Sequence, residues 1–153
     1  DAYLDHLPLR LNRMDGMVLA GVLPLIGELA QRNDVILGLL TGNIERGAWM
    51  KLEFFGMDHF FKFGGFGDRH HDRNQVAEAA MQAARAHANC HITKERVYVV
   101  GDTPNDVRCG RHIGAYVVAV ATGFYSTTEL AEEQPDLTLT DLADASELMK
   151  RLK

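Results

Sequence analysis

The sequence has little of what marks disulfide-rich, membrane-spanning or nucleic-acid-binding proteins. Its 153 residues include 2 cysteines, too few for a disulfide scaffold. No apolar run is long enough to cross a bilayer. No basic block stands out in a chain whose formal net charge is -5, and this argues against nucleic acid as a partner. These absences predict a cytoplasmic protein that binds neither nucleic acid nor a membrane, and they leave a homo-oligomer open.

Apolar runs alternate with helical patterns along most of the chain. The runs predict strands over residues 35–40, 97–100, 115–121 and 137–139, and a brief strand followed by a loop over residues 60–67. The helical patterns cover residues 2–13, 22–33, 44–55, 74–90, 105–113 and 141–152, with a short helix after residue 126. Strands that alternate with helices predict an α/β domain with a Rossmann-like, mostly parallel sheet and flanking helices.

Several single residues predict where these helices begin and end. Asn43 is a suitable N-cap for the helix over 44–55, and Gly56 is a suitable residue just beyond its end. Ser126 and Glu129 have the spacing of a capping box, so a helix should begin there.

Residues 97–106 combine a buried-strand pattern with two carboxylates. The apolar run ends at Gly101, Asp102 follows it, and Asp106 lies four positions later. Open α/β sheets place their ligands just beyond the carboxyl ends of such strands. Two neighbouring carboxylates repel each other, and a hard cation such as Mg²⁺ offsets that repulsion. The pattern favours a metal site, and a turn acid followed by an acid at a helix start is the alternative.

A second polar turn follows the predicted strand over residues 35–40. The Thr41 hydroxyl, with the backbone N–H groups of Gly42 and Asn43, is suited to hold a phosphate oxygen at a helix N-terminus. A strand-to-helix turn without a ligand is the alternative. Between the two turns, the polar loop over residues 67–74 contains Arg73 and Arg69, and either could stabilise negative charge on a phosphoryl group.

Two His–Cys pairs have the spacing of zinc ligands. They are His87 with Cys90 and Cys109 with His112. Each pair also fits one face of an ordinary helix, and this is the interpretation that we favour.

The order of these motifs resembles the haloacid-dehalogenase-like (HAD) hydrolase superfamily, and within it the phosphoglycolate-phosphatase-like members. Residues 39–43 are similar to the motif whose Thr binds the substrate phosphoryl group, and residues 99–115 are similar to the acidic motif that holds Mg²⁺. Residues 117–130 also follow the family pattern. The basic motif is the weakest match, because members often have Lys where this chain offers Arg73.

The family's nucleophile motif does not occur in these residues. In the family, the first Asp of an Asp-x-Asp-x-Thr/Val motif is the nucleophile, and it follows the central strand of the sheet. We therefore expect that the sequence lacks roughly the first third of the native protein. On this interpretation, residues 1–17 are the remnant of a helical cap. Residues 18–153 are the HAD-like core domain without its first strand.

The resemblance implies a Mg²⁺-dependent phosphohydrolase that acts on a small phosphorylated metabolite through an aspartyl-phosphate. Thr41 would bind phosphoryl oxygens, and Arg73 would offset their charge. Asp102 would bind Mg²⁺ directly, and Asp106 would bind it through water or orient Asp102. We expect the 153-residue chain alone to be inactive.

Other functions stay open at this point. They are a haloacid dehalogenase, which needs no metal, and a non-catalytic module that binds phosphate, a cation or a protein. A nucleotide-binding Rossmann-like domain is disfavoured, because no strand is followed by the Gly-x-Gly-x-x-Gly pattern.

Overall fold

A computed structural model describes residues 2–13, 16–70 and 72–152. The structure therefore does not describe residues 1, 14 and 15 of the predicted cap remnant. It also does not describe residue 71 of the predicted polar loop. The strands are β1 (Gly38–Leu40), β2 (Phe63–Gly65), β3 (Tyr98–Gly101), β4 (Tyr116–Val120) and β5 (Leu137–Leu139). The helices are α1 (Ala2–Arg13), α2 (Val22–Ala30), α3 (Glu45–Phe54), α4 (Arg73–Ala88), α5 (Pro104–His112), α6 (Thr127–Glu132) and α7 (Ser146–Arg151). Two short 3-10 turns are η1 (Asp58–Phe60) and η2 (Lys94–Arg96).

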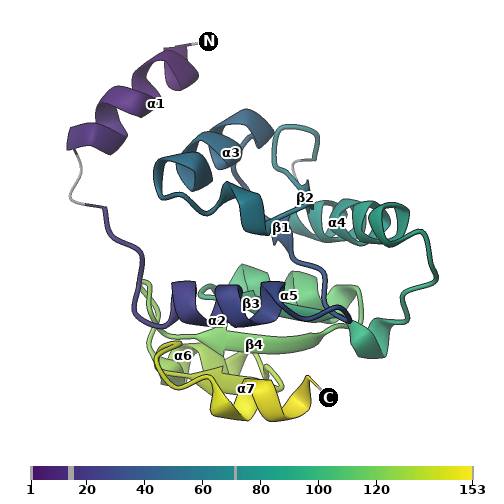
Figure 1. The fold of residues 1–153 in the computed structure, drawn as a ribbon. Coiled ribbons are helices and arrows are strands. Elements are labelled where there is room, and N and C mark those ends of the chain that lie inside the picture. Colours follow the sequence, from purple (N-terminus) through teal and green to yellow (C-terminus); the bar gives the residue numbers. More distant parts are fainter. Residues whose placement is uncertain (1, 14–15, 71, 153) are drawn as a thin grey trace.

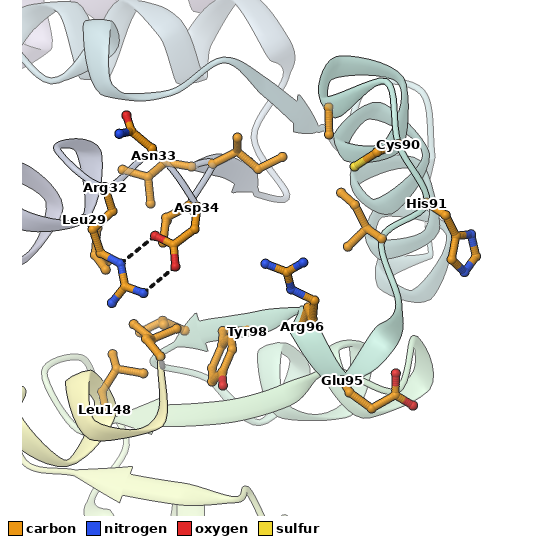
Figure 2. A pocket seen from close by; sticks show the side chains of 17 residues that line it. Leu29, Arg32, Asn33, Asp34, Cys90, His91, Glu95, Arg96, Tyr98 and Leu148 are labelled. Carbon is orange, nitrogen blue, oxygen red and sulfur yellow. Dashed lines mark hydrogen bonds and ion pairs between the residues drawn. The ribbon is translucent and has the colours of Figure 1, made fainter.

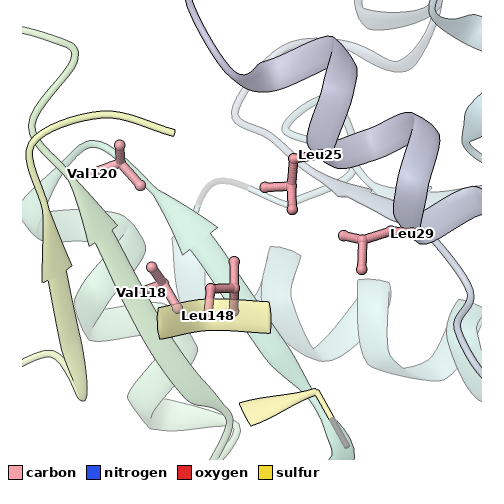
Figure 3. Close-up of a cluster of buried hydrophobic side chains, with 5 residues drawn as sticks. All are labelled: Leu25, Leu29, Val118, Val120 and Leu148. Atoms are coloured by element: carbon pink, nitrogen blue, oxygen red, sulfur yellow. The ribbon is translucent and has the colours of Figure 1, made fainter. Parts of the chain in front are cut away.

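The larger sheet contains β3, β4 and β5, all parallel, with β4 in the centre. Successive side chains of a strand point to opposite faces, and β4 is buried on both. Val118 and Val120 pack with Leu148 of α7 in a cluster that α2 completes (Figure 3). On the other face, Val117 and Ala119 pack with side chains of α5 and α6. Helices on both faces make this sheet the main core of the molecule.

The smaller sheet contains only β1 and β2, which are parallel to each other. It lies with α3 and α4 in the upper half of the view in Figure 1. Helix α4 packs closely on β2, because a Cβ atom on Gly65 would lie 2.2 Å from the carbonyl oxygen of Val76. Glycine at this position allows the backbones of helix and strand to approach.

A cleft separates the two sheets, and a gap of this kind is expected for a core domain without its central strand. Its volume is about 500 Å³. Residues 35–37 and β3 contribute to its lining, together with Leu148 of α7 (Figure 2). Val100 lies in β3 yet is 45% exposed, so apolar surface of this strand is left open. The strands are parallel as predicted, and the α/β fold class is confirmed.

The largest differences between predicted and observed element boundaries are in β1, α2 and α7. Of the predicted 35–40 strand, only Gly38–Leu40 form β1, because only these residues pair with β2 among the described residues. Helix α2 ends at Ala30 instead of residue 33. The final helix begins at Ser146, because Asp141 and Asp144 each accept a backbone N–H two residues ahead and form turns before it.

The predicted helix at the start of the chain is present as α1, with Pro8 inside it. It lies against α3, apart from the larger sheet (Figure 1). Tyr3 approaches Gly47 of α3, where a Cβ atom would lie 3.0 Å from the tyrosine ring. Leu7 is buried. No helix among the described residues is long and apolar enough to cross a membrane.

Candidate functional site

The turn after β1 is organised around the Thr41 hydroxyl. The Thr41 N–H donates to the Gly65 carbonyl of β2 at 3.1 Å, which ties the turn to the smaller sheet. The Thr41 Oγ1 atom accepts hydrogen bonds from the Asn43 backbone N–H at 3.1 Å and from the Asn43 side-chain amide at 2.9 Å. The Thr41 side chain is therefore held at the carboxyl end of the strand, as the sequence predicts.

Asn43 is not the N-cap of the following helix, so that prediction was wrong. Its side chain bonds to Thr41 instead, and Ile44 takes the N-cap position of α3 without a side-chain hydrogen bond. The Asp68 carboxylate accepts a hydrogen bond from the Glu45 N–H at 3.2 Å and partly replaces the missing cap. Gly56 has φ of 67° just beyond α3, which confirms the predicted helix end.

The loop before α4 lies directly on the Thr41 turn. The Gly67 N–H donates to the Asn43 carbonyl at 2.9 Å. A Cβ atom on Gly67 would lie only 2.2 Å from the carbonyl oxygen of Gly42, so a larger residue would push the two segments apart. Glycine at this position lets the loop that leads to Arg73 approach the turn.

Arg73 links the two predicted turns. It is the first residue of α4, whose N-cap is Asp72. Its guanidinium forms an ion pair with the Asp106 carboxylate. Its Nη1 atom lies 3.5 Å from the position that a Cβ atom on Gly42 would take. Residues from β1, α4 and α5 thus meet at one place.

Arg69, the alternative basic residue, points to a different partner. Its guanidinium bonds to Glu45 of α3 at 3.0 Å, and its side chain is 72% exposed. The Arg73 side chain is only 26% exposed. Because solvent screens exposed charge more strongly, the geometry favours Arg73 as the basic group of the site.

Asp106 is an acid at the start of helix α5, which was the alternative to a metal ligand at this position. It forms a capping box with Thr103, in which Thr103 accepts from the Asp106 N–H and Asp106 accepts from the Thr103 N–H. The Thr103 hydroxyl also donates to Asp106 Oδ2 at 2.8 Å. With Arg73 on Oδ1, three of about four acceptor positions of the carboxylate are engaged. Asp106 is therefore suited to orient its neighbours rather than to be a main metal ligand.

Asp102 is the carboxylate that fits direct metal binding. It is half-buried immediately after β3, and a Cβ atom on Gly123 would lie 2.3 Å from its Oδ2 atom. Glycine in the loop after β4 therefore leaves room for this carboxylate. Mg²⁺ commonly binds one or two protein carboxylates and keeps several waters. The chemistry of this carboxylate fits such an ion: Asp102 would hold it directly, and Asp106 would orient the groups around it.

The two His–Cys pairs have other contacts. The His87 ring lies 5.7 Å from the Phe63 ring, and His112 bonds to Glu78 at 2.7 Å. Cys109 is buried, and burial raises the pKa of its thiol above the ordinary value. Within the described ranges, no three His, Cys, Asp or Glu side chains gather as metal ligands would.

Lys51 of α3 is a residue of this site that we did not predict. Its ammonium donates to Asn43 Oδ1 at 2.9 Å and extends the hydrogen bonds of the Thr41 turn. The only sequence signal is that Lys51 lies in the helix that follows Asn43, eight residues further on. Surface lysines commonly occur at such positions, so this spacing does not single out Lys51.

Comparisons with known proteins show what part of this chain is similar to. Residues 76–145 match the family model described as HAD-hydrolase-like, and they include Asp102 and Asp106. Among curated proteins, none matches the chain. The predicted resemblance to the HAD-like superfamily is confirmed.

Solved structures show the same fold. A candidate phosphatase from Clostridium difficile is 23% identical with a TM-score of 0.72, and the match covers 84% of this chain and 59% of that one. A haloacid-dehalogenase-like hydrolase from Streptococcus pneumoniae is 20% identical with a TM-score of 0.71, with coverage of 86% and 59%. A candidate β-phosphoglucomutase from Thermotoga maritima is 19% identical with a TM-score of 0.71, with coverage of 87% and 60%. The chain thus spans about three fifths of the length of these proteins.

Proposed function

We propose that this chain provides the phosphoryl-binding and Mg²⁺-holding part of a phosphohydrolase that acts on a small phosphomonoester. The observation that carries the proposal is the position of Arg73 between the Gly42 turn and Asp106. A guanidinium there can offset the charge of an anion held by the Thr41 turn, while the acids beyond β3 suit a cation.

Each residue has a defined task in the proposed reaction. The Thr41 hydroxyl and the Gly42 N–H bind the phosphoryl oxygens and orient them for attack. Arg73 stabilises the negative charge that these oxygens carry in the transition state. Asp106 holds the Arg73 guanidinium in place. A Mg²⁺ ion bound by Asp102 would supply further charge neutralisation at the same oxygens.

The nucleophile of this proposal comes from a strand in the cleft between the sheets. Family members use an aspartate after a central strand, and they form an aspartyl-phosphate that water then hydrolyses. The cleft lies between residues 35–37 and β3, and it exposes apolar side chains such as Val100. An apolar strand ending in Asp-x-Asp-x-Thr would cover these side chains and place its carboxylates beside the Thr41 and Asp102 turns.

A non-catalytic module that binds phosphate is the second candidate. The residues described in this chain favour binding, because Arg73 pairs with Asp106 and lies close to Gly42 of the Thr41 turn. The Asp102 and Asp106 pair argues against a dehalogenase, whose reaction needs no metal. The localisation that we propose is cytoplasmic, with no nucleic acid or membrane as a partner.

Ligand titration of the 153-residue chain tests the proposal. We expect inorganic phosphate to shift the amide signals of Thr41 and Gly42 in a nitrogen-15 spectrum. We expect Asp102→Asn to weaken Mg²⁺ binding, whereas Asp58→Asn, an exposed acid of η1, should leave it unchanged. Phosphate that moves other signals but not this turn would contradict the proposed site.

An enzymatic assay separates the two candidates. We expect the chain alone with Mg²⁺ to hydrolyse p-nitrophenyl phosphate no faster than the buffer does. A longer form that carries the nucleophile strand should show Mg²⁺-dependent hydrolysis, and Asp102→Asn should abolish it. Rapid turnover by the 153-residue chain would show that the nucleophile lies within it.

A further inference from the structure

Lys51 reaches the Thr41 turn because of the direction of helical side chains. It lies in the last turn of α3 and is half-buried. Long side chains of a helix point back toward its N-terminus. Asn43 lies two residues before the first residue of α3, and the Lys51 ammonium meets its side-chain oxygen at 2.9 Å. The contact follows from the helix geometry and does not require an unusual backbone.

The chemistry of lysine fixes the orientation of Asn43. An ammonium group can only donate hydrogen bonds, so the atom that faces it must be the amide oxygen. The amide nitrogen of Asn43 then faces Thr41, and it donates to Oγ1 at 2.9 Å. Without Lys51, the two ends of this amide group could exchange places.

The orientation of Asn43 in turn decides what the Thr41 hydroxyl can do. The oxygen of a hydroxyl accepts two hydrogen bonds and its proton donates one. The Asn43 backbone N–H and side-chain amide supply the two donors to Oγ1. The capacity that remains is the proton, which can donate to a ligand oxygen.

We propose that Lys51 is a positioning residue that keeps the Thr41 hydroxyl as a hydrogen-bond donor toward an anion. This inference rests on the proposed phosphoryl-binding function of the turn. Hydrogen bonds run in one direction from Lys51 through Asn43 to Thr41, so each group polarises the next. The positive charge of Lys51 thus strengthens anion binding without contact between the ammonium and the ligand.

Two other roles of Lys51 give different results. A lysine in the last turn of a helix interacts favourably with the helix dipole, and loss of that interaction would lower stability but not phosphate affinity. A lysine that acts only as a distant positive charge would strengthen phosphate binding even when Asn43 is replaced. A double-mutant cycle between Lys51 and Asn43 distinguishes these roles.

The experiment titrates inorganic phosphate into the nitrogen-15-labelled chain in four forms. They are the wild type, Lys51→Met, Asn43→Ala and the double variant. We expect Lys51→Met to weaken phosphate binding about tenfold, the effect of one hydrogen bond from a charged group. The double variant should bind phosphate as weakly as Asn43→Ala alone. Lys51→Arg, which keeps a group with donors only, should retain most of the affinity.

Lys62 supplies the matched control. It is an exposed lysine whose ammonium donates to the His59 carbonyl at 2.8 Å. Lys62→Met removes the same charge from the chain and should leave phosphate affinity unchanged. If Lys51→Met does not fold, Lys51→Gln, which keeps a long polar side chain, takes its place in the cycle.

The outcomes separate this inference from the proposed function. Equal phosphate affinity of Lys51→Met and the wild type would overturn the role of Lys51. The role would also be overturned if Lys51→Met weakened phosphate binding by the same factor in Asn43→Ala as in the wild type. If phosphate does not shift the Thr41 signals of the wild type, the proposed function fails. The side-chain amide signals of Asn43 then test whether Lys51 orients Asn43. A change of these signals in Lys51→Met supports that contact, and identical signals reject it.

Discussion

The two parallel sheets use similar apolar sequences but bury them to very different extents. In the larger sheet, Val118 of β4 is 0% exposed because helices cover both faces and strands flank both edges. In the smaller sheet, Leu39 and Leu40 of β1 are only half-buried. The smaller sheet nevertheless positions the Thr41 turn. The less buried half of this chain thus holds the Thr41 side of the site, while the more buried half holds its acidic side, and local opening should occur first in the smaller sheet.

The largest effect should come from the core of the larger sheet. Leu130 of α6 is fully buried and packs against β4. Leu130→Ala removes this packing and should lower the free energy of unfolding by about 2–5 kcal/mol. Leu39→Ala, at a half-buried position of β1, should cost clearly less. Urea unfolding measures both values, and equal losses would contradict the contrast between the sheets.

A smaller and more local effect is expected at the contact of α4 with β2. Gly65→Ala would place a methyl group 2.2 Å from the Val76 carbonyl oxygen, and such overpacking costs about 1–3 kcal/mol. Amide hydrogen exchange should become faster in β1, β2 and α4, while β4 stays protected.

Gly27→Ala is the matched control for this substitution. Gly27 lies inside α2, and a Cβ atom there meets nothing within 4 Å. Alanine should stabilise the protein by about 0.5–1 kcal/mol, because it lowers the conformational freedom of the unfolded chain. Destabilisation by Gly27→Ala to the same extent as by Gly65→Ala would show that crowding is not the cause.

The smallest effect concerns an ion pair at the rim of the cleft. Arg32 bonds to Asp34 through both carboxylate oxygens and lowers the pKa of Asp34 from 3.8 to about 2 (Figure 2). A lowered pKa stabilises the folded state above the unfolded value of 3.8, and this stabilisation disappears as the pH falls toward 2.

Urea unfolding at several pH values tests this ion pair. Asp34→Asn should slightly lower the unfolding midpoint at neutral pH, and the difference from the wild type should vanish near pH 2. Arg32→Gln should lower the midpoint over the same pH range. A difference that persists unchanged at low pH would show that Asp34 acts through something other than its charge.

Local sequence signals predicted the features of the fold that depend on residues close together in the chain. The Ser126–Glu129 capping box is present, because its bonds connect residues three apart. The positions of Thr41 and Asp102 directly after strands were also predictable, because each follows an apolar run of the sequence.

Contacts between distant segments could not be predicted from the same signals. Asn43 has the residue type of an N-cap, but its side chain bonds to Thr41 and Lys51 instead. Asp68, 23 residues away from Glu45, accepts the hydrogen bond at the start of the helix. The division of the sheet does not follow from the strand patterns themselves, because they do not show which segments lie side by side. The expectation that the family's central strand is absent from these residues did point to a gap in the sheet, and β1 and β2 pair apart from the other three strands.

The Arg73–Asp106 ion pair would give the proposed phosphate site a form of selectivity. An anion that arrives at the Gly42 turn meets a guanidinium whose charge is already shared with a carboxylate. In the proposed site, Asp106 engages one nitrogen of the guanidinium and leaves other N–H donors for a ligand. The carboxylate lowers the net positive charge that a ligand would meet, so directed hydrogen bonds would contribute more to binding than charge alone. A phosphate, whose oxygens accept such bonds, would then be favoured over chloride.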